Sequence, residues 1–240
     1  MKNKISFVIP YYNEQDDILI LASDILSLKE NSLKNIKEFL FVDDGSKDKT
    51  TKKLKKVLVK KKSVYDKCLF LENHKNIGFA KSLITGLNKA SGNILVSIPS
   101  DGEVLLSEIL YKITSRTDNI DVIFFERYNI NIRPLNRIII SFFYRLIIAL
   151  FFRTKFRDTN GIFAIRRKNL FNLNLESVSF FINAEILSKA IYMKLKIRFD
   201  NFKLNSKMTN KSSSLNFFQL FLVLKDFIKT FNFIYVRKKI

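Results

Sequence analysis

Short apolar runs alternate with segments of helical spacing through the first half of the chain. A helix that buries one face repeats its apolar residues every three to four positions, whereas a buried strand is a short apolar run. The helical segments are Ile18–Leu28, Thr50–Val59 and Phe79–Lys89. The strand-like segments are Ile5–Ile9, Phe39–Val42, Cys68–Leu71, Ile94–Ile98 and Val122–Phe125. This alternation predicts an α/β fold with a doubly wound, mostly parallel sheet.

Two later apolar segments need to be tested as membrane spans. Ile138–Phe152 has fifteen residues and contains Arg145, whereas a span needs about 20 residues. Leu215–Val236 is long enough, but charged residues interrupt its middle, and its apolar residues repeat along one helical face. The charged residues are Lys225, Asp226 and Lys229, and the apolar ones are Phe217, Phe221, Leu224, Ile228, Phe231 and Tyr235. The pattern predicts a C-terminal amphipathic helical extension that packs on the domain or lies in a membrane interface.

The charge is strongly basic and unevenly distributed. The 240 residues include 42 Lys and Arg against 22 Asp and Glu, a net charge of +20. Residues 1–126 hold 20 basic and 17 acidic side chains, whereas residues 127–240 hold 22 and 5. Such a balance is typical of proteins that meet nucleic acid, anionic lipid or phosphorylated substrates, although a compositional bias toward lysine is an alternative reason. The second half is therefore expected to face a polyanion.

Cysteine and histidine are too scarce for a zinc site or a disulfide. Cys68 and His74 are the single residues of their types, so any metal is expected to have oxygen ligands. The apolar run Ile5–Ile9 is short and is broken at Pro10, unlike the apolar core of a secretory signal. We expect a cytoplasmic protein.

Polar clusters follow three of the predicted strands. They are Tyr12-Asn13-Glu14, Asp43-Asp44-Gly45-Ser46 and Ser100-Asp101-Gly102-Glu103. Ligands of doubly wound sheets bind at the carboxyl ends of the strands, which puts the three clusters in one site. Acidic groups can accept hydrogen bonds from a base or ribose, and carboxylates on a turn suit Mg²⁺ or Mn²⁺ beside a diphosphate. Helix capping by Ser46 and one Asp, and an ordinary acidic turn at Asp101, remain alternatives.

The order of these clusters resembles family 2 glycosyltransferases. The matching segments are Phe7-Val8-Ile9-Pro10-Tyr11-Tyr12-Asn13-Glu14, Phe41-Val42-Asp43-Asp44-Gly45-Ser46, Asn76-Ile77-Gly78-Phe79-Ala80, Gly86-Leu87-Asn88-Lys89-Ala90-Ser91-Gly92 and Ile98-Pro99-Ser100-Asp101. Further segments are similar to the polyprenyl-phosphate branch, which includes enzymes like dolichyl-phosphate mannose synthase. They are Glu126-Arg127-Tyr128, Arg137-Ile138-Ile139-Ile140-Ser141, Asp158-Thr159-Asn160-Gly161-Ile162-Phe163 and Glu185. The resemblance implies the A-type fold of nucleotide-diphospho-sugar transferases.

The resemblance also implies roles for individual residues. Asp101 and Glu103 would hold Mg²⁺ or Mn²⁺, and Arg127 would hold the phosphates, which makes Asp101 and Arg127 the catalytic pair. Arg137 and Ser141 would hold the phosphate of the lipid acceptor. The base and ribose would be held by Pro10, Tyr12, Glu14, Val42 and Asp44.

Two departures from the family pattern concern the diphosphate. Pro99 replaces the first Asp of the family's Asp-x-Asp, so the metal loses a potential ligand. In the basic loop that closes over the diphosphate, Lys207 takes the place of an Arg and Ser213 that of a Lys, while Lys211 can supply the missing charge. A Lys in place of an Arg keeps the charge and loses the forked geometry.

The resemblance implies an inverting transfer of a sugar from a nucleoside diphosphate, UDP or GDP, to a polyprenyl phosphate. The protein is expected at the inner face of the cell membrane, with residues 1–130 as the nucleotide and metal half, 131–214 as the acceptor half, and 215–240 as a basic helix. A saccharide hydroxyl acceptor in cell-surface glycan synthesis is the alternative; it needs a general base, for which Asp158 is the candidate. A catalytically impaired relative and a nucleic-acid-binding protein are further alternatives, although no nucleic-acid-binding module is recognised. A nucleotidyltransferase is disfavoured because no Gly-rich phosphate loop is present.

Overall fold

The computed structural model describes residues 4–115, 119–127, 135–154, 162–203 and 217–236. Within these ranges the strands form one seven-stranded sheet in the order β3-β2-β1-β4-β6-β5-β7. The strands are β1 (Ile5–Tyr11), β2 (Ile36–Asp43), β3 (Cys68–Glu72), β4 (Ile94–Ser97), β5 (Val122–Arg127), β6 (Ile162–Arg166) and β7 (Ile197–Phe202). The helices are α1 (Ile18–Ser27), α2 (Glu30–Leu33), α3 (Thr50–Leu58), α4 (Lys62–Tyr65), α5 (Phe79–Lys89), α6 (Leu106–Thr114), α7 (Leu135–Phe152), α8 (Arg167–Asn172), α9 (Ile182–Tyr192) and α10 (Phe217–Tyr235).

The predicted doubly wound, mostly parallel sheet is confirmed. Strand β1 pairs in parallel with both β2 and β4, β2 pairs in parallel with β3, and β5 pairs in parallel with β7. The exception is β6, which lies between β4 and β5 and runs antiparallel to both. All five predicted strands are present, and three helices lie within one residue of their predicted bounds.

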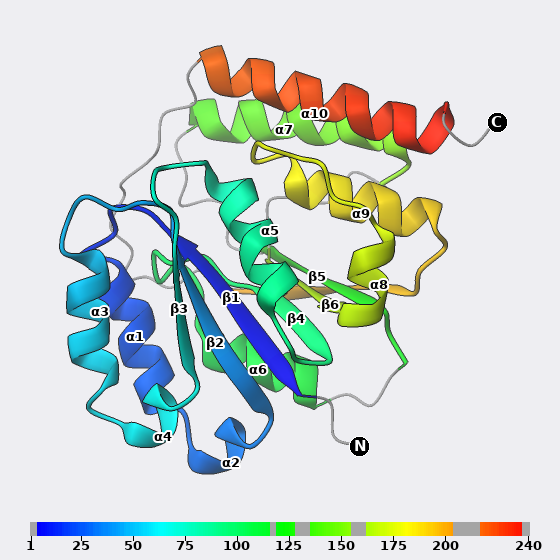
Figure 1. Ribbon diagram of the computed structural model, residues 1–240. Coiled ribbons are helices and arrows are strands. Elements are labelled where there is room, and N and C mark those ends of the chain that lie inside the picture. The colour runs from blue at the N-terminus through cyan, green and yellow to red at the C-terminus, as the bar shows by residue number, and fades with distance from the viewer. Residues whose placement is uncertain (1–3, 116–118, 128–134, 155–161, 204–216, 237–240) are drawn as a thin grey trace.

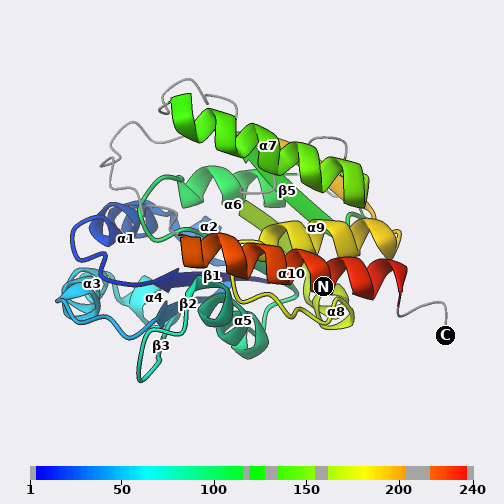
Figure 2. The same ribbon diagram turned by 90° about the horizontal axis from the view of Figure 1, so that it is seen from above.

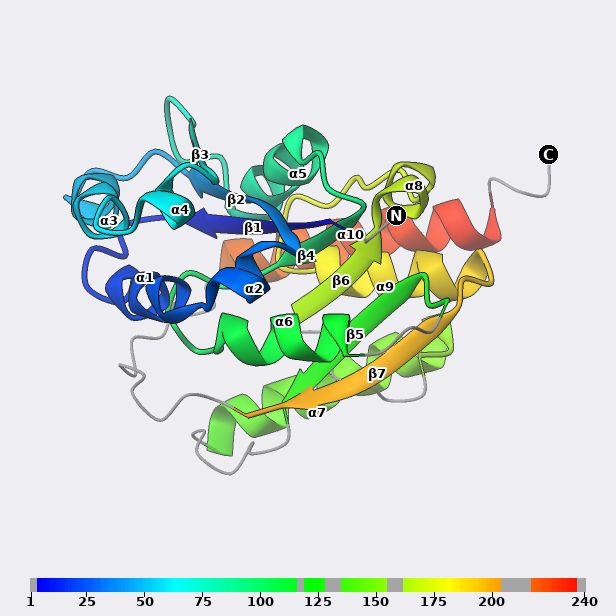
Figure 3. The same ribbon diagram turned by 90° about the horizontal axis from the view of Figure 1, so that it is seen from below.

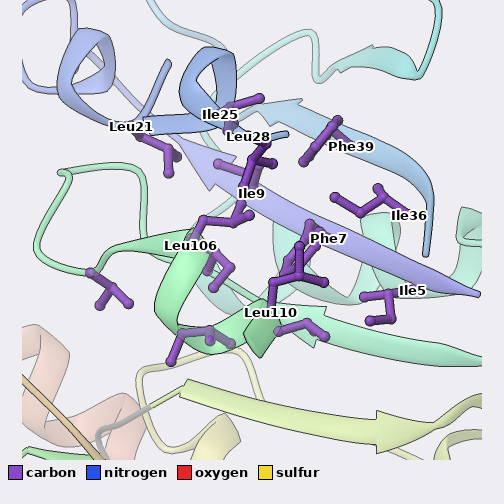
Figure 4. Packing of buried hydrophobic residues seen from close by; sticks show 14 of the residues in the cluster. Ile5, Phe7, Ile9, Leu21, Ile25, Leu28, Ile36, Phe39, Leu106 and Leu110 are labelled. Atoms are coloured by element: carbon purple, nitrogen blue, oxygen red, sulfur yellow. The ribbon is translucent and has the colours of Figure 1, made fainter. Parts of the chain in front are cut away.

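Apolar side chains fill both faces of the sheet because successive residues of a strand point to opposite sides. On one face Ile5, Phe7 and Ile9 of β1 pack with residues of α1 and α6, as Figure 4 shows. On the other face Val8 of β1 packs with residues of α5, α8 and α9. Figure 3 shows α1 and α6 on one side of the sheet and α5 and α8 on the other. This double covering holds the strands rigidly and leaves their carboxyl ends available for a site.

A third apolar cluster joins the helices of the second half. Phe181 at the start of α9 contacts Phe152 of α7 and Phe227 of α10, with ring centroids 6.3 and 6.1 Å apart. Figure 1 shows α7 and α10 along the top of the molecule, with α9 beneath them, and Figure 2, seen from above, shows α9 between the two. In this layer, and in the rest of the chain that the structure describes, no helix is both long and apolar enough to cross a membrane.

The predicted C-terminal amphipathic helix is present as α10. The face that it buries is only in part the apolar stripe that the sequence predicts. Phe221, Leu224 and Ile228, which share the predicted apolar stripe, are exposed. The face that packs against the domain carries Phe227 and Ile234 together with the buried Asp226. The predicted stripe is therefore divided, because these three residues lie on the outer side of the layer whereas Phe231 packs within it.

Candidate active site

Four loops meet at the edge of the sheet where the parallel strands β1 to β4 end. Residues 12–17 follow β1, residues 44–49 follow β2, residues 73–78 follow β3, and residues 98–105 follow β4. Strands β2 and β3 extend the sheet to one side of β1, and β4 lies on its other side. In a doubly wound sheet this reversal opens the crevice where ligands bind. The three predicted polar clusters therefore share one edge of the sheet.

The residues expected to hold the base and ribose lie on two adjacent strand ends. Pro10 and Val42 are opposite each other in the β1–β2 ladder, and both are buried. Tyr12, two residues beyond, is exposed. The amide N–H of Glu14 donates to Oγ1 of Thr50 at 2.9 Å, which ties the loop after β1 to the start of α3. Of these residues Tyr12 is exposed, whereas the side chain of Val42 packs in the apolar core with residues of α5.

Asp43 organises the turn that follows β2. Its Oδ1 accepts a hydrogen bond from the amide of Ser46 at 2.8 Å, and its Oδ2 accepts one from the hydroxyl of Thr51 at 2.5 Å. The hydroxyl of Thr51 also lies 2.8 Å from that of Tyr11. Asp43, the first carboxylate of the pair, therefore holds the turn after β2 to the start of α3, although the N-cap position of that helix is Lys49 and has no side-chain cap.

Asp44 holds the loop that follows β3. Its Oδ1 accepts hydrogen bonds from the amide of Ile77 and the hydroxyl of Ser82, both at 2.8 Å, and from Nδ2 of Asn73 at 3.2 Å. Its Oδ2 accepts one from the amide of Gly78 at 2.9 Å. Donors of this kind compensate for the burial of a carboxylate. Asp44 thus fixes residues 73–78 at the expected nucleotide surface.

Asn73 was not among the predicted site residues, although its position two residues after the predicted strand Cys68–Leu71 was a usable signal. Gly45 shows how closely the loops after β2 and β3 approach. It has φ 74°, and a Cβ there would come within 2.6 Å of the carbonyl carbon of Lys75. A side chain at this position would force the two loops apart.

The residues expected to hold metal and phosphates come together from β4 and β5. Arg127 at the end of β5 meets Glu103, with Nε 3.2 Å from Oε1 and Nη2 donating to Oε2 at 3.5 Å. Asp101, two residues before Glu103, accepts a hydrogen bond from the Glu103 amide at 2.9 Å. The cation and the two carboxylates therefore form one charged group beside the crevice.

Burial and the neighbouring Glu103 carboxylate raise the pKa of Asp101 to about 6. Both effects disfavour the charged form of a carboxyl group. A perturbed pKa in a crevice is a characteristic of functional sites. A cation that bound here would relieve the repulsion between the two acidic side chains.

Several predicted site residues lie outside the part of the chain that the structure describes. Lys207, Lys211 and Ser213 of the diphosphate loop fall there, and so does Asp158. Arg137 and Ser141 are in α7, whose described side chains begin at Phe142.

This sheet, with acidic loops at its reversal point, is the architecture of α/β proteins that bind ligands at the carboxyl ends of their strands. The family model described as glycosyl transferase family 2 matches residues 6–173, and the chain belongs to that family.

Two curated relatives carry polyprenyl phosphates in their names. The chain is 30% identical over 129 residues to undecaprenyl-phosphate 4-deoxy-4-formamido-L-arabinose transferase of Proteus mirabilis, covering 53% of this chain and 38% of the relative. It is 28% identical over 201 residues to dolichol-phosphate mannosyltransferase of Pyrococcus furiosus, covering 80% of this chain and 54% of the relative. The chain thus spans about half or less of the length of these relatives. The expected resemblance to the polyprenyl-phosphate branch is confirmed.

Solved structures confirm the A-type glycosyltransferase fold. Glucosyl-3-phosphoglycerate synthase from Mycobacterium tuberculosis, in complex with Mn²⁺, UDP and glucosyl-3-phosphoglycerate, superposes with a TM-score of 0.71. The match covers 95% of this chain and 80% of that chain at 17% sequence identity. At this identity the likeness concerns the fold alone.

Proposed function

We propose that the chain transfers a sugar from a nucleoside-diphosphate sugar to a polyprenyl phosphate, with inversion and with help from a divalent metal ion. The contact of Arg127 with Glu103, beside Asp101, is the observation that carries the proposal. It supports a diphosphate site at the end of β4, next to the carboxyl ends of β1 and β2. The names of the two curated relatives support the acceptor.

The residues present fit a divalent metal ion. Among the residues that the structure describes, no three His, Cys, Asp or Glu side chains gather as a metal cluster. Mg²⁺ commonly binds one or two carboxylates together with substrate phosphates, and Asp101 and Glu103 supply two. The raised pKa of Asp101 indicates a negative charge that a cation would stabilise. A metal ion bound by Asp101 and Glu103 would neutralise charge on the departing diphosphate.

The proposed reaction depends on the positions of the donor and the acceptor more than on proton transfer. An oxygen of the acceptor phosphate attacks the anomeric carbon, and the bond from that carbon to the diphosphate oxygen breaks on the opposite side. The acceptor is an anion at neutral pH, so it needs no general base. Arg127 provides positive charge for the leaving group, and Glu103 fixes the direction of its guanidinium group. These interactions stabilise the charge that develops as the bond breaks.

The exposed apolar surface of α7 and α10 supports work at an anionic membrane. Leu150 of α7 is 70% exposed. Other exposed side chains on these helices are Phe142, Phe143, Ile147, Phe151, Phe218, Leu220, Phe221, Leu224 and Ile228. Large exposed apolar surfaces mark interaction sites, and residues 127–240 hold 22 basic against 5 acidic residues. We place the protein at the inner face of the cell membrane, where acidic lipids would complement this charge.

Arg137 and Ser141 are the proposed contacts of the acceptor phosphate. They are four residues apart in α7, so they lie on the same side of the helix and can hold one phosphate together. The exposed apolar residues that follow, Phe142, Phe143, Ile147, Leu150 and Phe151, would lie along the isoprenoid chain.

The experiment compares wild type with Arg137→Ala/Ser141→Ala. Purified protein is incubated with UDP- and GDP-sugars, Mg²⁺ or Mn²⁺, and undecaprenyl phosphate or a soluble sugar. The variant should lose lipid glycosylation and keep nucleotide binding. Arg153→Ala is the matched control, because Arg153 is an exposed arginine beyond the other end of α7. Unchanged lipid transfer by the variant, or efficient transfer to the soluble sugar by wild type, would contradict the proposal.

A further inference from the structure

The C-terminal helix α10 carries one buried carboxylate, Asp226. Its side chain is 1% exposed, although the adjacent Lys225 is exposed. Oδ2 of Asp226 accepts hydrogen bonds from the amides of Val178 and Ser179, both at 2.9 Å, and from the hydroxyl of Ser179 at 2.6 Å. A carboxylate buried in this way needs such donors to remain favourable. Asp226 therefore attaches α10 to the loop that precedes α9.

The same loop contacts the start of α5. This helix borders the sheet edge around Asp44, where the donor nucleotide is proposed to bind and which we call the donor site. Phe180 stacks on Phe79, with ring centroids 5.8 Å apart and ring planes 24° apart. The carbonyl oxygen of Val178 lies 3.7 Å from the point where a Cβ on Gly78 would be. Gly78 in turn donates its amide N–H to Asp44 at 2.9 Å. Residues 178–180 thus lie between the carboxylate of Asp226 and the loop held by Asp44.

A second carboxylate holds the beginning of this loop independently. Glu185 of α9 accepts hydrogen bonds from the amides of Glu176 at 3.0 Å and Ser177 at 2.9 Å. It also forms a buried ion pair with Lys189, with Nζ 2.6 Å from Oε1. Because Glu185 fixes residues 176 and 177, the contribution of Asp226 is specific to residues 178 and 179. Removal of Asp226 should therefore loosen the part of the loop that contacts α5.

We propose that Asp226 is a positioning residue for the donor site. It holds residues 178–180 against the start of α5, and so keeps the amides of Ile77 and Gly78 directed at Asp44. The proposal rests on the proposed function in taking the donor nucleotide to bind beside Asp44. It assigns to α10 a role in donor binding in addition to contact with the membrane.

The first test needs no ligand. Amide hydrogen exchange of the full chain is compared between wild type, Asp226→Ala and the control Lys225→Ala, which removes a charge from the neighbouring exposed position. We expect Asp226→Ala to speed exchange at Ile77 and Gly78 by about tenfold or more. The variant removes the hydrogen bonds from Val178 and Ser179 to the charged carboxylate, and so loosens the residues that pack against the start of α5. Exchange in β1, at Phe7 and Ile9, should stay within about twofold of wild type in the same comparison.

Asp226→Asn keeps an acceptor oxygen but loses the charge, so it should speed exchange at Ile77 and Gly78 by a smaller factor, about threefold, which also provides a readout if the Ala variant does not fold. The proposal is wrong if exchange at Ile77 and Gly78 in the Asp226 variants matches that of the control. It is equally wrong if β1 speeds up by the same factor, since the role would then be one of global stability.

The second test measures donor-site binding in solution by calorimetry, with UDP and GDP as probes in the presence of Mn²⁺. For the nucleotide that wild type binds, the dissociation constant should rise about tenfold in Asp226→Ala and stay within about twofold in Lys225→Ala. If wild type binds neither nucleotide, the proposed function fails while the exchange experiment still decides the role of Asp226. If exchange changes as expected and nucleotide affinity does not, Asp226 positions the loop without affecting the donor, and the inference is overturned.

Discussion

The edge of the sheet around Asp44 and the helical layer around Phe181 are organised by different forces. At the sheet edge, Asp43, Asp44 and Thr50 connect successive loops through directional hydrogen bonds. In the helical layer, aromatic rings meet edge to face, as Phe227 does with Phe151 and Phe152 at 5.2 and 5.1 Å. Hydrogen-bond networks fix positions and directions, whereas apolar packing mainly excludes water. The difference suits a polar ligand at the first region and a lipid surface at the second.

The largest effect is expected from removing the centre of the helical layer. Phe181 is completely buried between α7 and α10, so Phe181→Ala should lower the free energy of unfolding by about 3–5 kcal/mol, as measured by urea denaturation. Phe180→Ala is the matched control, because Phe180 is the adjacent residue and is 43% exposed. Equal losses in the two variants would show that the layer is not held by its buried aromatic cluster.

At the sheet edge, Asp101→Asn should lower turnover by about 100-fold or more, or about 2.7 kcal/mol. The reason is that the variant removes the charge proposed to hold the metal ion while keeping the shape of the side chain. Turnover is measured with sugar nucleotide, Mn²⁺ and undecaprenyl phosphate, and circular dichroism checks the fold. Glu108→Gln, on α6 and paired with Lys112 at 3.4 Å, is the control. If Asp101→Asn retains more than about a tenth of wild-type turnover, the metal assignment is wrong.

Acid should weaken Mn²⁺ binding before it weakens the fold. Burial and Glu103 raise the pKa of Asp101 to about 6, so protons compete with the metal ion as the pH falls through 6. Affinity for Mn²⁺ should be about tenfold lower at pH 5 than at pH 7.

Lower pH has the opposite effect on the contribution of Asp101 to the stability of the fold. The folded state binds this proton more tightly than the unfolded chain does. The stabilisation from Asp101 is therefore fully present below the unfolded pKa of about 4 and is lost as the pH rises through 6. Titration of Mn²⁺ by electron paramagnetic resonance checks the affinity, with Asp101→Asn as the variant that should lack this pH dependence. Equal wild-type affinity at the two pH values would contradict the assignment.

The smallest effect is expected on the outer surface of the helical layer. Leu150→Ser and Phe221→Ser should each weaken binding to anionic vesicles by about 1 kcal/mol, or about fivefold, because each removes exposed apolar area. Tyr111→Ser is the matched control, since Tyr111 is also 70% exposed and lies on α6. Co-sedimentation at low and high salt is the measurement, and binding should fall steeply with ionic strength. Absence of binding at low salt, or release by detergent only, would contradict membrane contact of this kind.

The sequence predicts the first half of the fold well because its signals are local. Five apolar runs correspond to β1 to β5, and the polar clusters lie at one sheet edge as expected. Strands β6 and β7 were not predicted. The position of β6 depends on pairing with residues far away in the chain, such as Ala164 with Val96 and Ile123, which no local pattern encodes. The division into a domain of residues 1–214 and a helix of residues 215–240 stays a prediction.

The site was predicted in part for the same reason. Motif spacing located Asp44, Asp101 and Arg127 at the expected edge of the sheet. It could not show that Asp44 has four protein donors, because these come from loop residues 73–78 and from Ser82. Asp226 looks in the sequence like a polar interruption of an apolar helix. Its burial depends on a loop about 47 residues earlier in the chain.

The antiparallel strand β6 also determines how far a side chain must extend to cross the site. Because β6 lies between β4 and β5, those two strands are parallel to each other and two strand spacings apart, or about 10 Å. Their carboxyl ends consequently lie at the same edge, separated by the width of one intervening strand. Arg127 at the end of β5 and Glu103 in the loop after β4 bridge this width together. The inserted strand thus acts as a spacer between the two strand ends, which a long cationic side chain and a carboxylate on a loop connect.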